Sequence, residues 1–400
     1  MEVAVIVSAV RTPVGSFGGQ FKDVLATDLG AHAVRGALAR VHIAADEVDE
    51  VLLGCVLQAG LGQNPARQAA MAAGIPKETP ATTLNMACGS GLKAVALASQ
   101  IIRAGDADVV VAGGMESMSR APFLSEAARF GARMGDAELV DSMIHDCLWD
   151  SFGDFHLGIT AENVADRFGI SREEQDAFAA ASQQKAGRAV AEGVFDVEIV
   201  AVEMPPSTTG PVSVATDEHP RWDTTVERLG RLRPAFRRDG GTVTAGNASG
   251  QNDGAAALVL TSMRKANELG LEPLARIESH ASVGVDPSIM GIGPVPAIRR
   301  ALERAGLELA DVDVFELNEA FAAQAVAVQK ELGVDPERVN RHGGAIALGN
   351  PVGASGGRIL VTLLHELKRT AATHGVAALC VGGGQGQAIV VRNHLSGSRA

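Results

Sequence analysis

Short apolar runs alternate with amphipathic stretches along most of this chain. Runs with the length and composition of strands cover residues 3–7, 51–56, 109–112, 256–260, 312–317 and 377–381. Between two of them, apolar side chains recur at helical spacing over residues 92–102, and Gly105 marks the end of this predicted helix. Strands that are apolar throughout and alternate with helices predict an α/β fold with buried parallel strands.

A weak internal repeat divides the chain into two parts. The segment 89–93 leads into a strand-like run that ends at Gly113 and Gly114, and the segment 354–358 leads into another that ends at Gly382 and Gly383. We therefore expect two related halves, each of which brings a reactive segment to a shared seam.

Residues 119–243 differ from both halves. They contain both tryptophans and a capping box from Ser171 to Glu174, which predicts a helix through Lys185. We interpret this segment as an inserted loop domain. The predicted organisation is an N-terminal half of residues 1–118 and 244–270, a loop domain of residues 119–243, a C-terminal half of residues 271–393, and a tail of residues 394–400.

The composition suits a large core with many tight turns. The 400 residues are 46% hydrophobic, and the 46 glycines are about 12% of the chain, against the roughly 7% that is usual. A net charge of −12 argues against nucleic acid and anionic membrane surfaces as partners, because both attract basic patches. No apolar run reaches the roughly 18 residues of a membrane span, so we expect no membrane partner.

Four cysteines are spread along the sequence without the spacing of a metal site: Cys55, Cys88, Cys147 and Cys380. Scattered thiols suit a reducing compartment better than a disulfide framework. The apolar residues 3–7 follow the first residues directly, without the basic lead of a secretion signal. We expect a cytoplasmic protein without a metal.

Cys88 stands just before the predicted helix of residues 92–102, among Gly89, Ser90 and Gly91. At a helix entrance, free backbone N–H groups and the positive end of the helix dipole favour the thiolate, which is the nucleophilic form. The small neighbours let a substrate carbonyl approach main-chain donors, as an oxyanion site requires. The pattern indicates a nucleophile for acyl groups; the alternative is a small buried cysteine.

The Cys88 segment and several further motifs, in this order and spacing, resemble the thiolases, most closely the acetyl-CoA acetyltransferase group. The motifs are residues 8–13, 113–119, 244–250, 314–322, 343–357 and 379–386. The resemblance implies the thiolase-like α/β fold, with two related βαβ-type halves in a layered α-β-α-β-α arrangement. In that family the inserted loop domain covers coenzyme A and supports a dimer of dimers, so we expect a homotetramer. The glycine-rich runs lack the strand and helix context of a dinucleotide site.

The resemblance also implies the reaction. It is a reversible Claisen condensation between an acyl-CoA and acetyl-CoA, with acetoacetyl-CoA as the product of two acetyl groups, and no cofactor beyond the coenzyme A thioesters. Cys88 would carry the acyl group and Cys380 would act as the acid/base, a role that suits a thiol with a tuned pKa. The alternative for Cys380 is a buried cysteine at a strand end.

Two oxyanion sites are implied by the same resemblance. In one, the N–H groups of Cys88 and Gly382 hold the acyl carbonyl oxygen. In the other, Asn318, through a water, and the side chain of residue 350 hold the enolate oxygen. Asn318 could instead be a structural helix cap, because asparagine is common there, and Glu319 could be another. Their setting in the sequence Asn-Glu-Ala-Phe, residues 318–321, favours a functional role for both.

Asn350 departs from the family pattern, in which this position is a histidine. The asparagine amide can donate a hydrogen bond, but it cannot hold a proton near pH 7 or stabilise a thiolate as an imidazolium does. We therefore expect reduced activity; the alternatives are an impaired acyl-CoA binding protein or a slow acyl-CoA hydrolase. His342 precedes the glycine-rich turn, and we interpret it as structural.

The substrate contacts follow by resemblance alone. Ser249 matches a contact to the pantetheine arm, His156 and Leu157 form a wall of the acyl pocket, and Arg221 lies near the adenine end of coenzyme A. Met290 and Phe321 line the thioester channel. The alternatives are a turn residue for Ser249, a solvated surface charge for Arg221 and a core filler for Met290.

Overall fold

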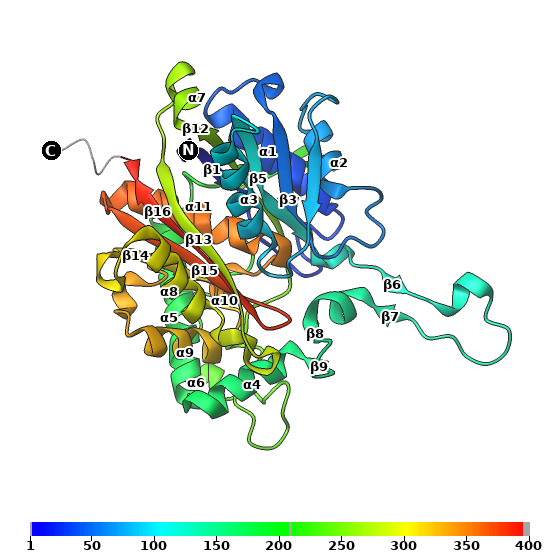
Figure 1. Ribbon diagram of the computed structural model, residues 1–400. Coiled ribbons are helices and arrows are strands. Elements are labelled where there is room, and N and C mark those ends of the chain that lie inside the picture. The colour runs from blue at the N-terminus through cyan, green and yellow to red at the C-terminus, as the bar shows by residue number, and fades with distance from the viewer. Residues whose placement is uncertain (1, 208–209, 395–400) are drawn as a thin grey trace.

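The computed structural model describes residues 2–207 and 210–394 (Figure 1). The predicted tail of residues 394–400 therefore lies outside the described residues, apart from His394. Over the described part of the chain, no helix combines the length and the apolar character that crossing a bilayer requires.

The N-terminal half is built on strands β1, β12, β5, β3 and β4, in that order across the sheet. Their bounds are Ala4–Arg11, Asn252–Ser262, Val109–Ser117, Glu50–Gly54 and Ala81–Leu84, and the short β2, Gly15–Ser16, pairs with β12. β12 runs antiparallel to β1 and β5, whereas β3 runs parallel to β5 and β4. The apolar runs of the sequence thus became strands of this sheet.

The C-terminal half is built on strands β14, β15, β16 and β13, in that order. Their bounds are Val314–Leu317, His374–Val381, Gln385–Asn393 and Ala275–Gly284. Two residue pairs, Val5 with Arg276 and Ile6 with Ala275, join β1 to β13. Through this short contact the two halves form one ten-stranded sheet within the described residues.

The expectation of parallel strands was wrong for most of this sheet. β14 is parallel to β15, but β16 is antiparallel to both β15 and β13. A tight turn joins β15 to β16, in which Gly383 and Gly384 have φ angles of +80° and +79°, and such a turn can connect only antiparallel neighbours. An apolar run shows that a strand is buried on both faces; it does not give the strand's direction.

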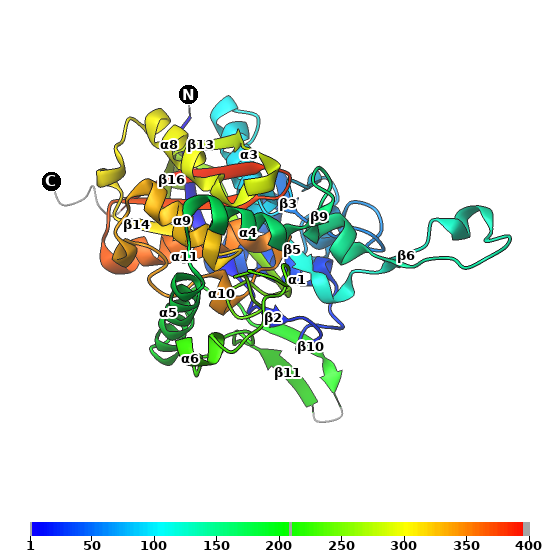
Figure 2. The same ribbon diagram turned by 90° about the horizontal axis from the view of Figure 1, so that it is seen from below.

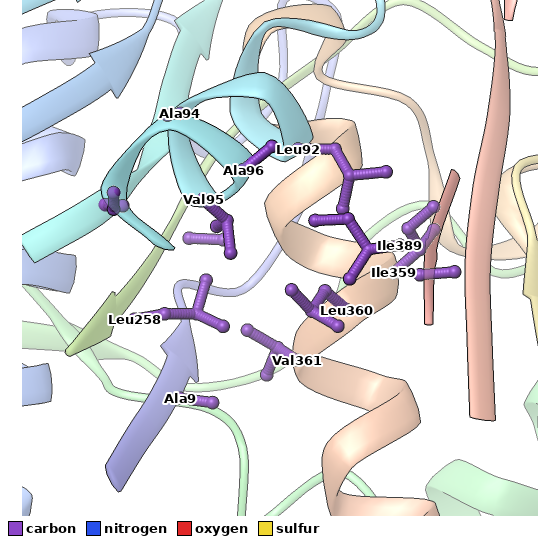
Figure 3. Close-up of a cluster of buried hydrophobic side chains, with 14 of the residues drawn as sticks. Ala9, Leu92, Ala94, Val95, Ala96, Leu258, Ile359, Leu360, Val361 and Ile389 are labelled. Atoms are coloured by element: carbon purple, nitrogen blue, oxygen red, sulfur yellow. The ribbon is translucent and has the colours of Figure 1, made fainter. Parts of the chain in front are cut away.

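Helices α3, Ser90–Ala104, and α11, Val352–Thr370, form the middle layer. They pack against each other, and α11 contacts β5 and β12 of one half and β14 and β15 of the other. Figure 3 shows their apolar side chains gathered with Leu258 of β12 and Ile389 of β16. Leu92, Leu258 and Leu360 in this cluster are fully buried. The cluster therefore holds the two halves together.

Two glycines allow α3 and α11 to approach closely. A Cβ atom on Gly91 would lie 2.9 Å from the backbone nitrogen of Gly357, and one on Gly356 would lie 2.5 Å from that of Leu92. Such contacts leave no room for any side chain at either glycine. The repeated sequence segments are thus the starts of these two helices, and each helix leads into a central strand, β5 or β15.

Outer helices complete the layers. On the N-terminal half, α1, Ala26–Arg40, packs on β12 and on α2, Pro65–Ala72; on the C-terminal half, α8, Pro294–Ala305, packs on β13 and β16. The layered α-β-α-β-α arrangement is confirmed. Three further α-helices belong to the described residues of the two halves: α7, Met263–Glu268, α9, Ala322–Leu332, and α10, Ala345–Leu348.

The inserted segment leaves the sheet after β5 and returns to it at β12. It contains β6, Phe123–Leu124, β7, Val140–Asp141, β8, Trp149–Asp150, β9, Phe155–His156, α4, Leu157–Phe168, α5, Arg172–Ala191, β10, Val202–Ser207, β11, Gly210–Val214, and α6, Val226–Leu229. The predicted capping box is present at the start of α5, which continues beyond Lys185 to Ala191. Helices α4 and α5 pack against α9.

Two parts of this segment project from the body of the molecule. Figures 1 and 2 show β6, β7 and the chain between them as a long arm, and Figure 2 shows β10 and β11 as a separate hairpin. The arm carries apolar side chains in solvent; Phe130 is 87% exposed and Met134 is 97% exposed.

Candidate active site

A cavity of about 510 Å³ lies between the inserted segment and the two halves. Its lining includes most of the predicted site residues: Cys88, His156, Leu157, Arg221, Ser249, Met290, Phe321 and Asn350. The other three, Cys380, Asn318 and Gly382, lie next to this set. A second groove, of about 910 Å³, lies between β1 and the second half of α11 and has no cysteine in its lining. The first cavity is therefore the candidate site.

A strained turn presents Cys88 at the entrance of α3. Ala87, just before it, has a φ of +43°, a region that side chains other than glycine rarely adopt. The hydroxyl of Ser90 holds this turn, because it accepts the N–H of Met86 at 2.9 Å and donates to the carbonyl of Ala87 at 2.6 Å. The thiol is 7% exposed and belongs to the cavity lining.

The expectation that the helix entrance favours the Cys88 thiolate was wrong in its net effect. Burial raises the pKa of the Cys88 thiol, and the nearby carboxylate of Glu116 raises it further. The backbone N–H groups of Gly382 and of Cys88 itself lower the pKa, but by less than burial raises it. Desolvation of the charged form thus outweighs the local donors.

Gly382 follows β15 and lies beside the turn that carries Cys88. A Cβ atom on Gly382 would lie 3.7 Å from the Cβ of Ala87 and 3.8 Å from a methyl of Leu157. The backbone N–H of Gly382 lowers the pKa of the Cys88 thiol. The two amides named from the sequence therefore lie on neighbouring segments, an arrangement that suits an oxyanion on a carbon attached to the Cys88 sulfur.

Cys380 lies at the end of β15, opposite Gly386 of β16, and is fully buried. Burial raises the pKa of its thiol, and the charge of Cys88 adds to the effect. Cys380 packs in one cluster with Leu157, Met290 and Phe321, which line the same cavity as Cys88. At neutral pH the Cys380 thiol is protonated, so it can donate a proton.

Asn318 and Asn350 contact each other directly. The Nδ2 of Asn318 donates to the Oδ1 of Asn350 at 3.2 Å, and the Nδ2 of Asn350 donates to the Ser249 hydroxyl at 3.2 Å. The Ser355 hydroxyl also donates to the Oδ1 of Asn350, at 2.7 Å. Asn318 keeps its own Oδ1 free of any donor from the described residues.

Glu319 and His342 serve packing. The carboxyl of Glu319 accepts hydrogen bonds from Ser182 at 2.7 Å and from Asn340 at 2.8 Å, and neither contact involves the cavity. His342 lies 2.9 Å from a carboxyl oxygen of Glu366. These contacts favour a structural role for both side chains, as the sequence indicated for His342.

The wall of the cavity holds His156 in one orientation. Its Nδ1 accepts the N–H of Gly158 at 3.0 Å, and its ring stacks on Phe236 with centroids 4.7 Å apart. Burial lowers the pKa of His156, so the ring is neutral at pH 7. Arg221 is exposed and belongs to the cavity lining, and its backbone N–H donates to the side-chain oxygen of Gln183 at 2.7 Å.

Three residues of this region were missed from the sequence. Cys147 lines the cavity from a π-helix, Ile144–Leu148, and burial, with a smaller effect of Cys88, raises the pKa of its thiol. His219 lines the cavity and contacts Asn252, whose side chain accepts the N–H of Asn350 at 2.8 Å. Glu116, near the end of β5, raises the pKa of the Cys88 thiol. The positions of these three residues depend on contacts between distant parts of the chain. In the sequence, only the motif of residues 113–119 could have indicated one of them, Glu116.

The fold and this site define the class of protein. Residues 4–264 match the family model "Thiolase, N-terminal domain", and residues 271–393 match "Thiolase, C-terminal domain". The chain belongs to the thiolase family, and it is an enzyme of that family.

Individual relatives agree over nearly the whole chain. An acetyl-CoA acetyltransferase of Pseudomonas aeruginosa is 60% identical over 98% of this chain and 99% of its own length. An acetyl-CoA acetyltransferase of Cupriavidus necator is 56% identical over 98% of this chain and 99% of its own length. The crystal structure of the Bacillus anthracis acetyl-CoA acetyltransferase matches with a TM-score of 0.96 and 46% identity, over 98% of this chain and 99% of that one.

Proposed function

We propose that this enzyme transfers acyl groups between coenzyme A thioesters, with acetyl-CoA and acetoacetyl-CoA as substrates and a Cys88 acyl-enzyme as the intermediate. One observation carries the proposal: Cys88 lines the cavity at the entrance of α3, and Gly382 lies directly beside the turn that carries it. The names of the relatives support the choice of acetyl-CoA.

In the thiolysis direction, the Cys88 thiolate attacks the ketone carbon of acetoacetyl-CoA. The bond between that carbon and the methylene carbon breaks, and the acetyl group stays on Cys88. The electron pair goes to the departing acetyl-CoA carbanion, which takes a proton from the Cys380 thiol. The raised pKa of Cys380 keeps that proton in place at neutral pH. The thiol of coenzyme A then gives its proton to the Cys380 thiolate, and its sulfur attacks the acetyl carbon. The bond from that carbon to Cys88 breaks, which releases a second acetyl-CoA and the Cys88 thiolate, and condensation is the reverse sequence.

The enolate oxygen of acetyl-CoA needs a second set of donors. We assign it to Asn318 and Asn350, which lie together beside the cavity. Their amides supply hydrogen bonds but no base. Because the pKa of Cys88 is raised and no imidazole stands at position 350, we infer that turnover is reduced. The same two facts favour the second candidate, an acyl-CoA binding protein or slow hydrolase.

The remaining lining residues suit the thioester substrate. We assign Ser249 to the pantetheine arm, His156 and Leu157 to the acyl wall, Met290 and Phe321 to the channel, and Arg221 to the adenine end. All six belong to the lining of the one cavity. The exposed position of Arg221 at its rim suits a contact with the charged end of coenzyme A.

A homotetramer is the proposed assembly. The apolar arm around Phe130 and Met134 is exposed in the single chain, and association would remove it from water. Strand β4 pairs with β3 alone within the described residues, so its free edge also suits association. The division into an N-terminal half, a loop domain of residues 119–243 and a C-terminal half of residues 271–393 is part of this proposal; the cytoplasmic location stays a prediction.

The loss of acetoacetyl-CoA, followed over time with and without coenzyme A, tests the reaction. We expect loss that depends on coenzyme A and yields two acetyl-CoA per acetoacetyl-CoA, and Cys88→Ala should abolish it. Loss at the same rate without coenzyme A would favour the hydrolase. Binding without any loss would favour the binding protein.

A further inference from the structure

Glu116 is a fully buried carboxyl near the end of β5 that the proposed reaction does not use. One carboxyl oxygen accepts the N–H of Val56 at 3.0 Å and the N–H of Gly353 at 2.8 Å. The other accepts the N–H of Leu57 at 3.1 Å and lies 3.7 Å from the Cys55 sulfur. A single side chain thus ties together three segments that are far apart in the sequence.

The hydrogen bond from the backbone N–H of Gly353 links Glu116 to the start of α11. This N–H lies in the first turn of α11, where backbone N–H groups have no partner within the helix, and an acceptor with negative charge is favoured at this end of the dipole. Asn350 is only three residues earlier, and Val352 lines the cavity with Cys88. Glu116 therefore holds the segment that sets the position of Asn350.

The same junction reaches the nucleophile. A Cβ atom on Gly353 would lie 2.8 Å from the Glu116 carboxyl, and one on Gly91 would lie 3.0 Å from the carbonyl of Gly353. Gly91 belongs to the first turn of α3, three residues after Cys88. The starts of α3 and α11 thus meet at Gly353. Glu116 accepts the backbone N–H of the same glycine.

We propose that Glu116 is a positioning residue for acyl transfer, which fixes the start of α11, and with it Asn350, relative to Cys88. The inference rests on the proposed function. Glu116 would keep the distance between Cys88 and Asn350 constant. A small change in such a distance lowers the rate of a reaction between bound groups.

The charge of Glu116 provides a signal that does not depend on turnover. Burial raises the pKa of Glu116 to about 7, so its charge changes near neutral pH. The titratable groups that respond to it in the described part of the chain are the thiols of Cys55, Cys88 and Cys147, and α11 contributes only the N–H of Gly353. Because the charge raises the pKa of Cys88, its removal should lower that pKa.

Glu116→Gln separates positioning from mere stability. The variant loses the charge, and its amide NH₂ faces backbone N–H donors where an oxygen accepted them. We expect kcat for thiolysis to fall on the order of 10- to 100-fold while KM for coenzyme A changes little. We also expect the rate of Cys88 alkylation by iodoacetamide, measured against pH, to shift to lower pH. Unchanged kcat and an unchanged alkylation profile would overturn the proposal.

Two further variants complete the test. Glu116→Asp keeps the charge but shortens the reach, so kcat should fall while the alkylation profile stays in place; wild-type kcat would overturn the proposal even if Glu116→Gln does not fold. Glu162→Gln is the matched control, because Glu162 is a buried carboxyl that accepts the N–H groups of Thr242 and Val243 at 2.9 Å and 3.0 Å. It should lower stability without shifting the alkylation profile. Alkylation of Cys88 can be measured without any turnover. If the unaltered enzyme shows no acyl transfer, that result contradicts the proposed function, whereas the alkylation profiles still test the role of Glu116.

Discussion

Asn318 donates from its Nδ2 to the Oδ1 of Asn350 at 3.2 Å, so the two amides form one hydrogen-bonded pair beside Cys88. The Oδ1 of Asn350 also accepts from Ser355, and its Nδ2 donates to Ser249. Every polar atom of the Asn350 side chain is thus engaged by the protein. A side chain so held is well oriented as a donor, but it has no capacity to carry a proton during the reaction.

Restoring the imidazole by Asn350→His should raise turnover. A histidine at this position can hold a proton near pH 7, and general-base help of this kind is worth on the order of 10²-fold or more in rate. The gain should appear in kcat, with the KM for coenzyme A nearly unchanged, in a steady-state assay of thiolysis. Asn350→Gln is the control, because it adds length without a base. An equal gain in both variants would show that the base is not the cause.

The pH profile should differ between the unaltered enzyme and Asn350→His. The folded pKa of Cys88 is raised, so the thiolate fraction near neutral pH is small and increases as pH rises toward that pKa. The unaltered enzyme should therefore gain activity steadily above pH 7. Asn350→His should show a flatter rise, because the imidazole supplies the base at lower pH. Parallel profiles for the two proteins would count against this account of Asn350.

The sequence predicted the segments that form the site, but not how strongly burial acts on them. Helix α3 begins where Cys88, Gly89 and Ser90 indicated, and its end at Gly105 has the expected left-handed φ of +85°. The pKa of Cys88 was misjudged because desolvation depends on packing from β15 and the inserted segment, which lie far away in the chain. Local helix geometry shows only that the backbone N–H groups lower the pKa of Cys88; it does not show how far burial raises that pKa.

The direction of the strands and the contacts of Glu116 could not be predicted from the sequence either. Apolar runs located β5, β12 and β15, yet β5 pairs antiparallel with β12, and the long insertion between them does not fix a strand direction. The partners of Glu116 are Val56, Leu57 and Gly353, which are 59 to 237 residues away. No local pattern encodes contacts over such separations.

The close approach of α3 and α11 should make Gly356 intolerant of a side chain. A Cβ atom there would lie 2.5 Å from the backbone of Leu92, so Gly356→Ala must push the helices apart. We expect a loss of stability on the order of 1–3 kcal/mol or more, measured by urea unfolding. Gly357→Ala is the neighbouring control, with its nearest contact 3.1 Å away on the side chain of Ala256, and it should cost less. Equal losses would contradict the proposed packing cause.

The exposed arm should control assembly. Replacement of both Phe130 and Met134 by serine removes the most exposed apolar side chains of the arm, so the tetramer should dissociate to dimers. Light scattering at micromolar concentration measures the mass directly. Leu269→Ser, an exposed leucine just after α7, should leave the mass unchanged. An unaltered protein with the mass of one chain would refute the proposed assembly.

Intact-mass spectrometry after mixing with acetoacetyl-CoA tests the central claim, that Cys88 carries the acyl group, most directly. In Cys380→Ala, the thiol that we assign to proton transfer is absent, so acetylation from acetyl-CoA should accumulate on Cys88 while cleavage of acetoacetyl-CoA is lost. Cys88→Ala should show no adduct with either thioester, and peptide mapping of Cys380→Ala should place one acetyl group on Cys88. Equal acyl labelling of Cys88→Ala and the unaltered enzyme would contradict the account.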